Sequence, residues 1–307
     1  MLEILKNPNF DFLGKARYFV AFSLLLIVAG IVAMSRPGGI HFGVEFSGGT
    51  QVIARFQKTP EVDHIRAAIP DAVIQNYDAP AKNQVLIRRS AEGEAVDKQA
   101  PAILNALSQK YGENPVVESS AEVVGPVVGA ELRRKAVQLT VLGLIFQLIY
   151  IAVRFKGAVW GAAATVAGFH DVLVTLAFLT FFKFEITLNV IAALLTLVGY
   201  SVNDTIVIFD RARENLRHKR KDPLRKIIND SVNQTLSRTL ISNGTTFLAV
   251  LGLMFGGEVL RGFAFTMAVG IVVGTYSTIY IASPFVIWWT DLMSRRQGPG
   301  GTAKAAL

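Results

Sequence analysis

The stretch that decides the fold is residues 186–209, which run ITLNVIAALLTLVGYSVNDTIVIF. About 20 mostly apolar residues in an α-helix are enough to cross the hydrocarbon core of a bilayer. Leu, Ile, Val and Ala dominate this segment, so it predicts a transmembrane helix. The polar residues inside it are costly in lipid, and each is therefore a candidate functional group.

Five other segments share this apolar character, which predicts a polytopic α-helical membrane protein with six transmembrane helices. The expected helices cover residues 18–34, 136–153, 158–182, 186–209, 240–255 and 262–289. The composition agrees, because 51% of the 307 residues are hydrophobic and only 18% are charged. The first helix could instead be a signal peptide, but its apolar run is long and Ala33-Met34-Ser35 is a poor cleavage site.

Basic residues set the expected orientation and explain the net charge of +8. They gather in the short segments before the first helix, between the second and third, after the fourth and after the sixth. Under the positive-inside rule these segments are cytoplasmic. We therefore expect the positive charge to serve orientation in the lipid bilayer, and we expect no nucleic acid as a partner. The cluster Arg133, Arg134 and Lys135 falls on the other side, after a long translocated segment where the rule is weak.

The expected organisation follows from these assignments. Residues 1–17 form a cytoplasmic N-terminus, 18–36 the first helix and 37–132 a periplasmic domain. Residues 133–290 hold the other five helices with a basic cytoplasmic loop at 211–237, and 291–307 form a cytoplasmic tail whose Gly-rich end, 297–307, is expected to be disordered. The absence of cysteine excludes disulfides and thiolate metal sites.

The segment 37–132 has the pattern of an α+β ferredoxin-like domain. A hairpin is expected first, with strands at 44–46 and 51–56 around the turn Ser47-Gly48-Gly49. A helix at 61–69, strands at 72–77 and 84–89, a helix at 95–110 and a strand at 116–124 follow. This is the split βαβ order with one added strand.

The polar residues of the fourth expected helix share one side. At 100° per residue, a stripe about 100° wide holds Asn189, Thr196, Tyr200, Asn203 and Asp204. Such a stripe faces neighbouring helices or a water-filled path in preference to lipid.

Asp204 and Arg238 form the first candidate site, a proton pathway. Asp204 lies ~10 Å inside the expected cytoplasmic boundary, and Arg238 begins the next expected helix, so the two could form an ion pair. Opening such a pair would favour protonation of the carboxylate, and closing it would release the proton. A static buried pair that fixes helix packing explains the same residues equally well.

Asp171 in the third expected helix is a further candidate for the same pathway, and His170, Asn203 and Tyr200 are weaker candidates. Adjacent helical residues point about 100° apart, so we expect that Asp171 and His170 do not face one site. Lys183, Glu185, Glu258 and Arg261 lie in short loops and are interpreted as solvated turn charges. Gly157 with Gly161, and Gly270 with Gly274, have the four-residue spacing that permits close helix approach.

Several motifs together resemble the SecD/SecF family of bacterial protein-export proteins, on its SecF side. They are YSVNDTIV at 200–207 followed by DRAREN at 210–215, SVNQTLSRTL at 231–240, HDV at 170–172, GVEFSGGT at 43–50, FGG at 255–257 and LRGF at 260–263. Together they span nearly the whole chain. The family often has Asp where Glu45 stands here, a change that keeps the charge.

The resemblance implies a subunit that works with SecD in a bundle of the resistance-nodulation-division type. It implies assistance to the SecYEG channel and the SecA motor, with YajC and YidC as further partners, and contact with unfolded chains in transit. It also implies use of the proton-motive force, with Asp204 and Arg238 at charged proton-pathway positions, and location in the inner membrane with both termini cytoplasmic.

No enzymatic activity is expected. The chain has no phosphate-binding P-loop, no nucleophile elbow and no metal-ligand spacing, so we expect no cofactor beyond the proton as coupling ion. Two alternatives to a proton-driven export subunit remain from the sequence: a passive scaffold of the translocase, and a small-molecule or lipid exporter of the same architecture.

Overall fold

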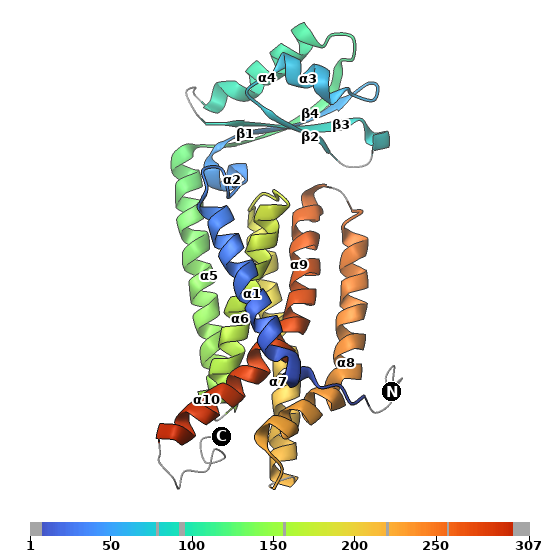
Figure 1. Ribbon diagram of the computed structural model, residues 1–307. Helices are drawn as coiled ribbons and strands as arrows, with labels where there is room; N and C mark the ends of the chain where they lie inside the picture. The colour runs from blue at the N-terminus through green and yellow to red at the C-terminus, as the bar shows by residue number, and fades with distance from the viewer. Residues whose placement is uncertain are drawn as a thin grey trace.

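The computed structural model describes residues 8–77, 80–91, 96–155, 158–218, 221–256 and 258–296. It shows a helical bundle with a small sheet domain stacked on one end (Figure 1). Helix α1 begins and helix α10 ends at the opposite end of the bundle (Figure 1). The expected tail at 297–307 and Gly157 lie outside the described residues.

The bundle is built from long helices with short connections. They are α1 (Phe12–Ser35), α5 (Pro126–Phe155), α6 (Ala158–Phe181), α7 (Leu188–His218), α8 (Leu224–Leu253), α9 (Glu258–Ser277) and α10 (Ser283–Arg296). Among the described residues, five helical stretches are long and apolar enough to cross a membrane: Phe12–Ser35, Pro126–Ile151, Ala158–Phe181, Leu188–His218 and Leu260–Arg295. They coincide with five of the six expected transmembrane helices.

The remaining expected helix, 240–255, is the C-terminal half of α8 and is not among these five. Ser242, Asn243, Thr245 and Thr246 make this half less apolar than its neighbours. It stands beside α9 over the same height of the bundle (Figure 1). The described residues therefore contain five helical stretches that are long and apolar enough to cross a membrane. That α8 crosses the membrane as a sixth helix is a proposal.

The last apolar stretch is not one straight helix. Between α9 and α10 lies a π-helical segment, η2 (Thr278–Ala282), and the Ser283 hydroxyl donates a 2.9 Å hydrogen bond to the Thr278 carbonyl. A π-helical turn inserts one residue into the helical repeat and redirects the chain. α10 accordingly runs obliquely to α9 (Figure 1).

The sheet domain follows the order expected from its alternating apolar residues. It contains β1 (Gly49–Phe56), α3 (Val62–Ala68), β2 (Val73–Tyr77), β3 (Gln84–Ser90), α4 (Val96–Lys110) and β4 (Val116–Val124). The antiparallel sheet has the strand order β2-β3-β1-β4, the split βαβ pattern. α3 and α4 cover the face away from the bundle, where Ile65, Ile87, Ile103 and Leu107 form its core (Figure 1).

The expected strand at 44–46 is wrong, and with it the added strand of the sheet. Residues Val44–Ser47 form a short helix, α2. Val44 and Phe46 are both buried, and Phe46 packs in the apolar cluster of the bundle with Ile186, away from the sheet. Gly48 ends α2 at φ 73°, a conformation that glycine adopts without strain. The prediction of a strand rested on only two apolar residues, Val44 and Phe46, two positions apart. A pattern this short does not distinguish a strand from a helix.

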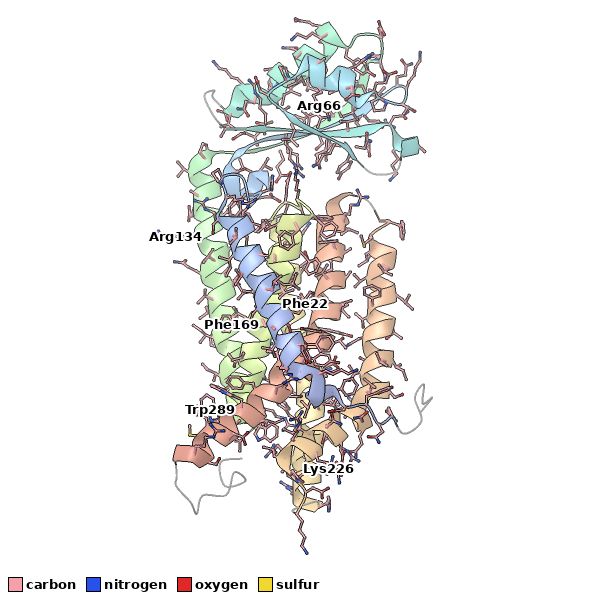
Figure 2. All side chains as sticks on the ribbon, in the orientation of Figure 1. Phe22, Arg66, Arg134, Phe169, Lys226 and Trp289 are labelled. Carbon is pink, nitrogen blue, oxygen red and sulfur yellow. The ribbon has the colours of Figure 1, made fainter. Side chains whose placement is uncertain are left out.

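Basic side chains lie near both ends of the bundle. Arg134 lies on the part of α5 near the sheet domain, whereas Lys226 lies at the far end, on α8 (Figure 2).

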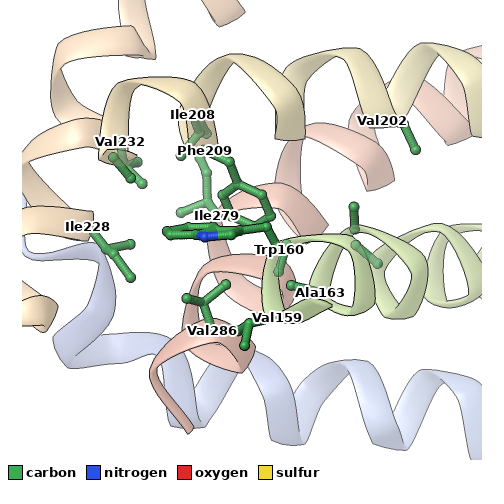
Figure 3. Close-up of a cluster of buried hydrophobic side chains, with 14 of the residues drawn as sticks. Val159, Trp160, Ala163, Val202, Ile208, Phe209, Ile228, Val232, Ile279 and Val286 are labelled. Carbon is green, nitrogen blue, oxygen red and sulfur yellow. The ribbon is translucent and has the colours of Figure 1, made fainter. Parts of the chain in front are cut away.

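At the end of the bundle opposite the sheet domain, a cluster of buried apolar side chains joins α6, α7, α8 and α10 (Figure 3). At its centre the Trp160 and Phe209 rings meet edge to face, with centroids 4.9 Å apart. This cluster fixes the lower half of α7.

α7 and α9 approach so closely that only glycine fits at one contact. A Cβ added at Gly270 would lie 2.3 Å from Leu197 Cδ1 on α7. A Cβ added at Gly274 would lie 3.0 Å from the Ser201 side chain, also on α7. The spacing of Gly270 and Gly274 thus serves close helix packing, as expected.

We predict that Gly270→Val destabilises the bundle. The added side chain would overlap Leu197 and force α7 and α9 apart, at a cost of about 1–3 kcal/mol. Gly252→Val in α8 is the matched control, because a Cβ there meets nothing within 4 Å. Thermal unfolding in detergent should show a lower midpoint for Gly270→Val alone, and equal midpoints for the two variants would contradict the packing argument.

Candidate functional site

Asp204 lies where α7, α8 and α9 meet. Its side chain is buried, and Asn243 Nδ2 on α8 donates to Asp204 Oδ2 at 2.5 Å. The same Nδ2 lies 2.5 Å from Thr275 Oγ1 on α9. Asn243 Oδ1 is buried, and within the described residues it has no hydrogen-bond partner. The carboxylate is thus held by a neutral amide whose other end is unused.

The ion pair expected between Asp204 and Arg238 does not form in this structure. Among the ion pairs of the described chain, none joins the two residues within 4.0 Å, and the Arg238 side chain is exposed on α8. Arg238 remains close enough to act on Asp204 electrostatically. Asn243, which the sequence analysis missed, occupies the contact instead. The sequence signal for Asn243 was an amide inside the expected transmembrane helix 240–255.

His170 and Asp171 face one site, so the expectation that they point apart is wrong. His170 Nδ1 lies 3.0 Å from Asp171 Oδ1, and Ser201 Oγ on α7 donates to Asp171 Oδ2 at 2.5 Å. His170 and Asp171 are both buried, Asp171 completely. The 100° between adjacent Cα–Cβ bonds is overcome because the imidazole turns back over the neighbouring carboxylate.

A hydrogen-bonded row continues from His170 to α1. His170 Nε2 lies 3.0 Å from Ser23 Oγ, and Ser23 Oγ lies 2.8 Å from the Tyr276 hydroxyl on α9. The Tyr276 hydroxyl donates to the Phe19 carbonyl. Ser23 and Tyr276 had no signal in the sequence, because a single serine or tyrosine in a transmembrane helix is common.

The polar stripe expected on α7 divides between two surroundings. Asp204 is buried, and the half-buried Tyr200 has its hydroxyl 2.8 Å from Thr246 Oγ1 on α8. Asn189, Thr196 and Asn203 are exposed on the surface of this chain. Only part of the stripe therefore faces helices of the same chain.

The loop between α6 and α7 contacts the sheet domain. Glu185 and Arg88 of β3 form an ion pair with side chains only 20% and 19% exposed. The interpretation of Glu185 as a solvated charge is therefore wrong, because β3 lies directly over it. Two backbone bonds tie the same loop to the segment between α1 and α2, from Gly43 N to the Ile186 carbonyl at 3.0 Å and from Ile186 N to the His41 carbonyl at 2.7 Å.

The other loop charges behave as expected where the structure describes them. Lys183 and Arg261 are exposed, and the side chain of Glu258 lies outside the described part of the chain. A cavity of about 500 Å³ separates the sheet from the bundle beside the Arg88–Glu185 pair, and Arg261, Asn189 and Tyr77 line it. Among the described residues, the apolar clusters of the sheet domain and of the bundle are separate, and the Arg88–Glu185 pair bridges the two parts.

These features define the class: a multi-pass helical membrane protein with ionisable groups buried between its helices and a small α+β domain at one end. Residues 103–292 match the family described as protein export membrane protein SecD/SecF, C-terminal. The protein translocase subunit SecF of Gemmatimonas aurantiaca is 42% identical over 94% of this chain and 89% of its own length. The corresponding subunit of Calditerrivibrio nitroreducens is 41% identical over 96% of this chain and 99% of its own.

A solved structure agrees with these relatives. The crystal structure of SecDF, a translocon-associated membrane protein from Thermus thermophilus, superposes with a TM-score of 0.80 at 37% identity and covers 93% of this chain. This chain spans 39% of that SecDF chain. The chain therefore belongs to the SecD/SecF family of protein-export membrane proteins, as a SecF-type protein translocase subunit.

We predict that Glu185→Gln loosens the sheet domain from the bundle. The variant loses a charge-assisted hydrogen bond worth about 1.5–3 kcal/mol. The chain has no cysteine, so spin labels can be placed uniquely at Ala67 on α3 and Lys183 in the loop. The distance distribution between the two labels should broaden.

Glu131→Gln is the control for this experiment. Glu131 forms an exposed ion pair with Lys135 on α5, with side chains 60% and 62% exposed, and it does not contact the sheet. This variant should leave the distance distribution unchanged. A distribution that stays narrow in Glu185→Gln would show that the ion pair does not hold the domain.

Proposed function

We propose that this SecF-type subunit assists Sec-dependent export across the inner membrane together with SecD, and that protonation of Asp204 couples this work to the proton-motive force. The observation that carries the proposal is the contact between Asp204 and Asn243. A carboxylate held by a neutral amide can gain or lose a proton without leaving an opposite charge buried and unpaired.

Asn243 suits both protonation states of Asp204. The amide has a donor end and an acceptor end. With Asp204 ionised, Nδ2 donates to it, as the structure shows. With Asp204 protonated, a rotated amide would accept the carboxyl proton through Oδ1, the atom that has no partner among the described residues. Arg238, exposed but within electrostatic range, would favour the ionised form and so modulate the exchange.

The gradient is large enough for this role. One elementary charge that crosses 100 mV carries ~2.3 kcal/mol. That energy shifts a two-state equilibrium by tens of fold. The movement biased in this way would be that of the sheet domain on the bundle, across the Arg88–Glu185 pair and the cavity beside it.

The proposed orientation follows from the ends of the bundle. The end of the bundle opposite the sheet domain holds the start of α1, the connection between α7 and α8, and the end of α10 (Figure 1). The basic segments lie at this same end. Under the positive-inside rule it is cytoplasmic, which makes the sheet domain periplasmic and places both termini in the cytoplasm. This arrangement requires α8 to cross the membrane as a sixth helix.

A second helical bundle would explain the exposed face of α7. Thr196 and Asn203 are exposed there, and Gly199 between them has open space around it. On α5, in contrast, the exposed residues are apolar, as suits lipid: Val137, Leu139, Val141, Leu142, Ile145, Phe146 and Ile149. The Asn203 amide would remain unsatisfied if it faced lipid, so we assign the α7 face to SecD and the α5 face to lipid.

Family membership supports the remaining partners. SecYEG, SecA, YajC, YidC and unfolded chains in transit are proposed on that basis alone. A passive scaffold and a small-molecule or lipid exporter are the alternatives, and the first experiment below separates the scaffold from the proton-driven subunit.

We predict that Asp204→Asn slows export of a secreted precursor by about tenfold or more. The substitution keeps the shape and the contact with Asn243 but removes the titratable group, and ~2.3 kcal/mol of lost drive corresponds to more than one factor of ten. Precursor processing would be measured in cells whose only copy carries the variant, with subunit level and SecD binding checked in parallel.

Asp210→Asn is the matched control on the same helix. Asp210 pairs with Arg154 at 2.8 Å at the partly exposed end of α7, and its loss should leave export near normal. Normal export in Asp204→Asn cells would rule out the proton-driven function and leave the scaffold.

We predict that Gly199→Leu weakens binding to SecD without unfolding this subunit. A Cβ at Gly199 meets nothing within 4 Å in this chain, so the added side chain would project into the partner. Val141→Trp, on the apolar exposed face of α5, adds comparable bulk toward lipid and should leave binding intact. Co-purification with tagged SecD measures the effect, and equal recovery of SecD by both variants would exclude the α7 face as the interface.

A further inference from the structure

We infer that His170 and Asp171 form a second proton-binding site in the bundle, separate from Asp204, which holds one proton in this structure. The site is defined by hydrogen-bond directions alone, through Ser23 on α1, Tyr276 on α9 and Ser201 on α7. Its use in export rests on the proposed function, but its existence does not.

The directions are fixed from the Tyr276 end. A carbonyl oxygen only accepts, so the single hydroxyl hydrogen of Tyr276 is donated to Phe19. Ser23 must therefore supply the hydrogen of its 2.8 Å contact with the Tyr276 oxygen. That uses the only hydroxyl hydrogen of Ser23, so His170 Nε2 must carry the hydrogen of the 3.0 Å contact with Ser23. The network thus assigns a proton to Nε2.

The contact on the other side of the ring then requires one more proton. A neutral imidazole protonated at Nε2 has a lone pair at Nδ1. Two acceptors 3.0 Å apart repel, so a proton must lie between Nδ1 and Asp171 Oδ1. Whether it is assigned to the imidazole or to the carboxyl, the pair has zero net charge and one proton more than a neutral histidine beside a carboxylate.

Burial favours the form of the His170–Asp171 pair that holds this additional proton. Asp171 is fully buried and His170 is 6% exposed. Within the described ranges, His170 is the ion-pair partner of Asp171. Losing the proton would leave a buried carboxylate without a cation, which is costly. Ser201 supplies a hydrogen bond at 2.5 Å but no charge.

The groups around the pair define the side on which the proton can leave. Tyr276 stacks on the His170 ring at 6.0 Å, and Tyr280 of η2 lies 5.4 Å from Tyr276. α1 contributes Ser23, and α7 contributes Ser201, with Asp204 three residues further on.

The row through Tyr276 ends at a carbonyl, which has no proton to pass on. The open side is therefore that of Ser201 on α7, ~4.5 Å along the helix axis from Asp204. Release of the proton toward this side takes the pair from zero net charge to −1, and uptake reverses the change.

The experiment measures the protonation of His170 directly. The full-length subunit, bound to SecD in lipid nanodiscs, would be labelled with ¹⁵N-histidine, of which the chain has four. His170→Gln identifies the His170 signals. The ¹⁵N shifts distinguish a ring with hydrogen on Nε2, on Nδ1 or on both. We expect Nε2 to carry hydrogen at neutral pH and the neutral Nδ1–H form to be absent.

Tyr276→Phe should change this tautomer and Tyr280→Phe should not. Without the Tyr276 hydroxyl, Ser23 is free to donate to Nε2, and the neutral Nδ1–H form should appear. Tyr280→Phe removes a hydroxyl from the same aromatic cluster without touching the row, and is the matched control. If Tyr276→Phe does not fold, Ser23→Ala removes the acceptor of the Nε2 hydrogen itself and should abolish the preference for Nε2.

Three results would overturn the inference: an Nδ1–H tautomer in the parent protein at neutral pH, an Nδ1 shift that shows a free lone pair with no proton shared with Asp171, or an equal response to the two tyrosine variants. The outcome is independent of export. If Asp204→Asn cells export normally and His170 shows the expected tautomer, the proposed function is wrong and the second proton-binding site stands. If Asp204→Asn blocks export but His170 shows the Nδ1–H tautomer, the second proton-binding site is wrong and the proposed function stands.

Discussion

The structure depends on one constraint, that polar groups inside a membrane bundle must find partners within the protein. α7 carries several of these groups, and their partners lie on other helices. Ser201 bonds Asp171 on α6, Asp204 accepts from Asn243 on α8, and Thr205 Oγ1 lies 3.0 Å from Thr278 Oγ1 on η2. The same interactions that satisfy the polar groups therefore place α7 at the centre of the bundle.

This central helix also links the buried polar groups to the sheet domain. α7 follows directly on the loop that contains Glu185 and Ile186, which contact Arg88 and His41. At its other end, Phe209 packs against Trp160 in the apolar cluster of Figure 3. A change at Asp204 would act on a helix that is firmly packed at one end, so the polar contact at the other end is where movement would emerge.

Local patterns predicted the elements well, and long-range contacts limited the prediction of the site. The cost of polar groups in lipid was enough to single out Asp204, and alternating apolar residues located β1 to β4. Nothing local indicated that β3 would lie over Glu185, or that Ser23, far away in the sequence, would bond His170. Such contacts exist only once the helices and the domain have been assembled.

The proposed function requires that the energy of one proton be comparable to the strength of the domain contact. A charge-assisted hydrogen bond such as Arg88–Glu185 contributes about 1.5–3 kcal/mol. One charge moved through 100 mV carries ~2.3 kcal/mol. A large apolar interface between sheet and bundle would exceed that energy several times over, and the domain would never leave the bundle. Under the proposed function, the polar cavity of about 500 Å³ beneath the sheet would keep this contact within the range that a single protonation event can open and close.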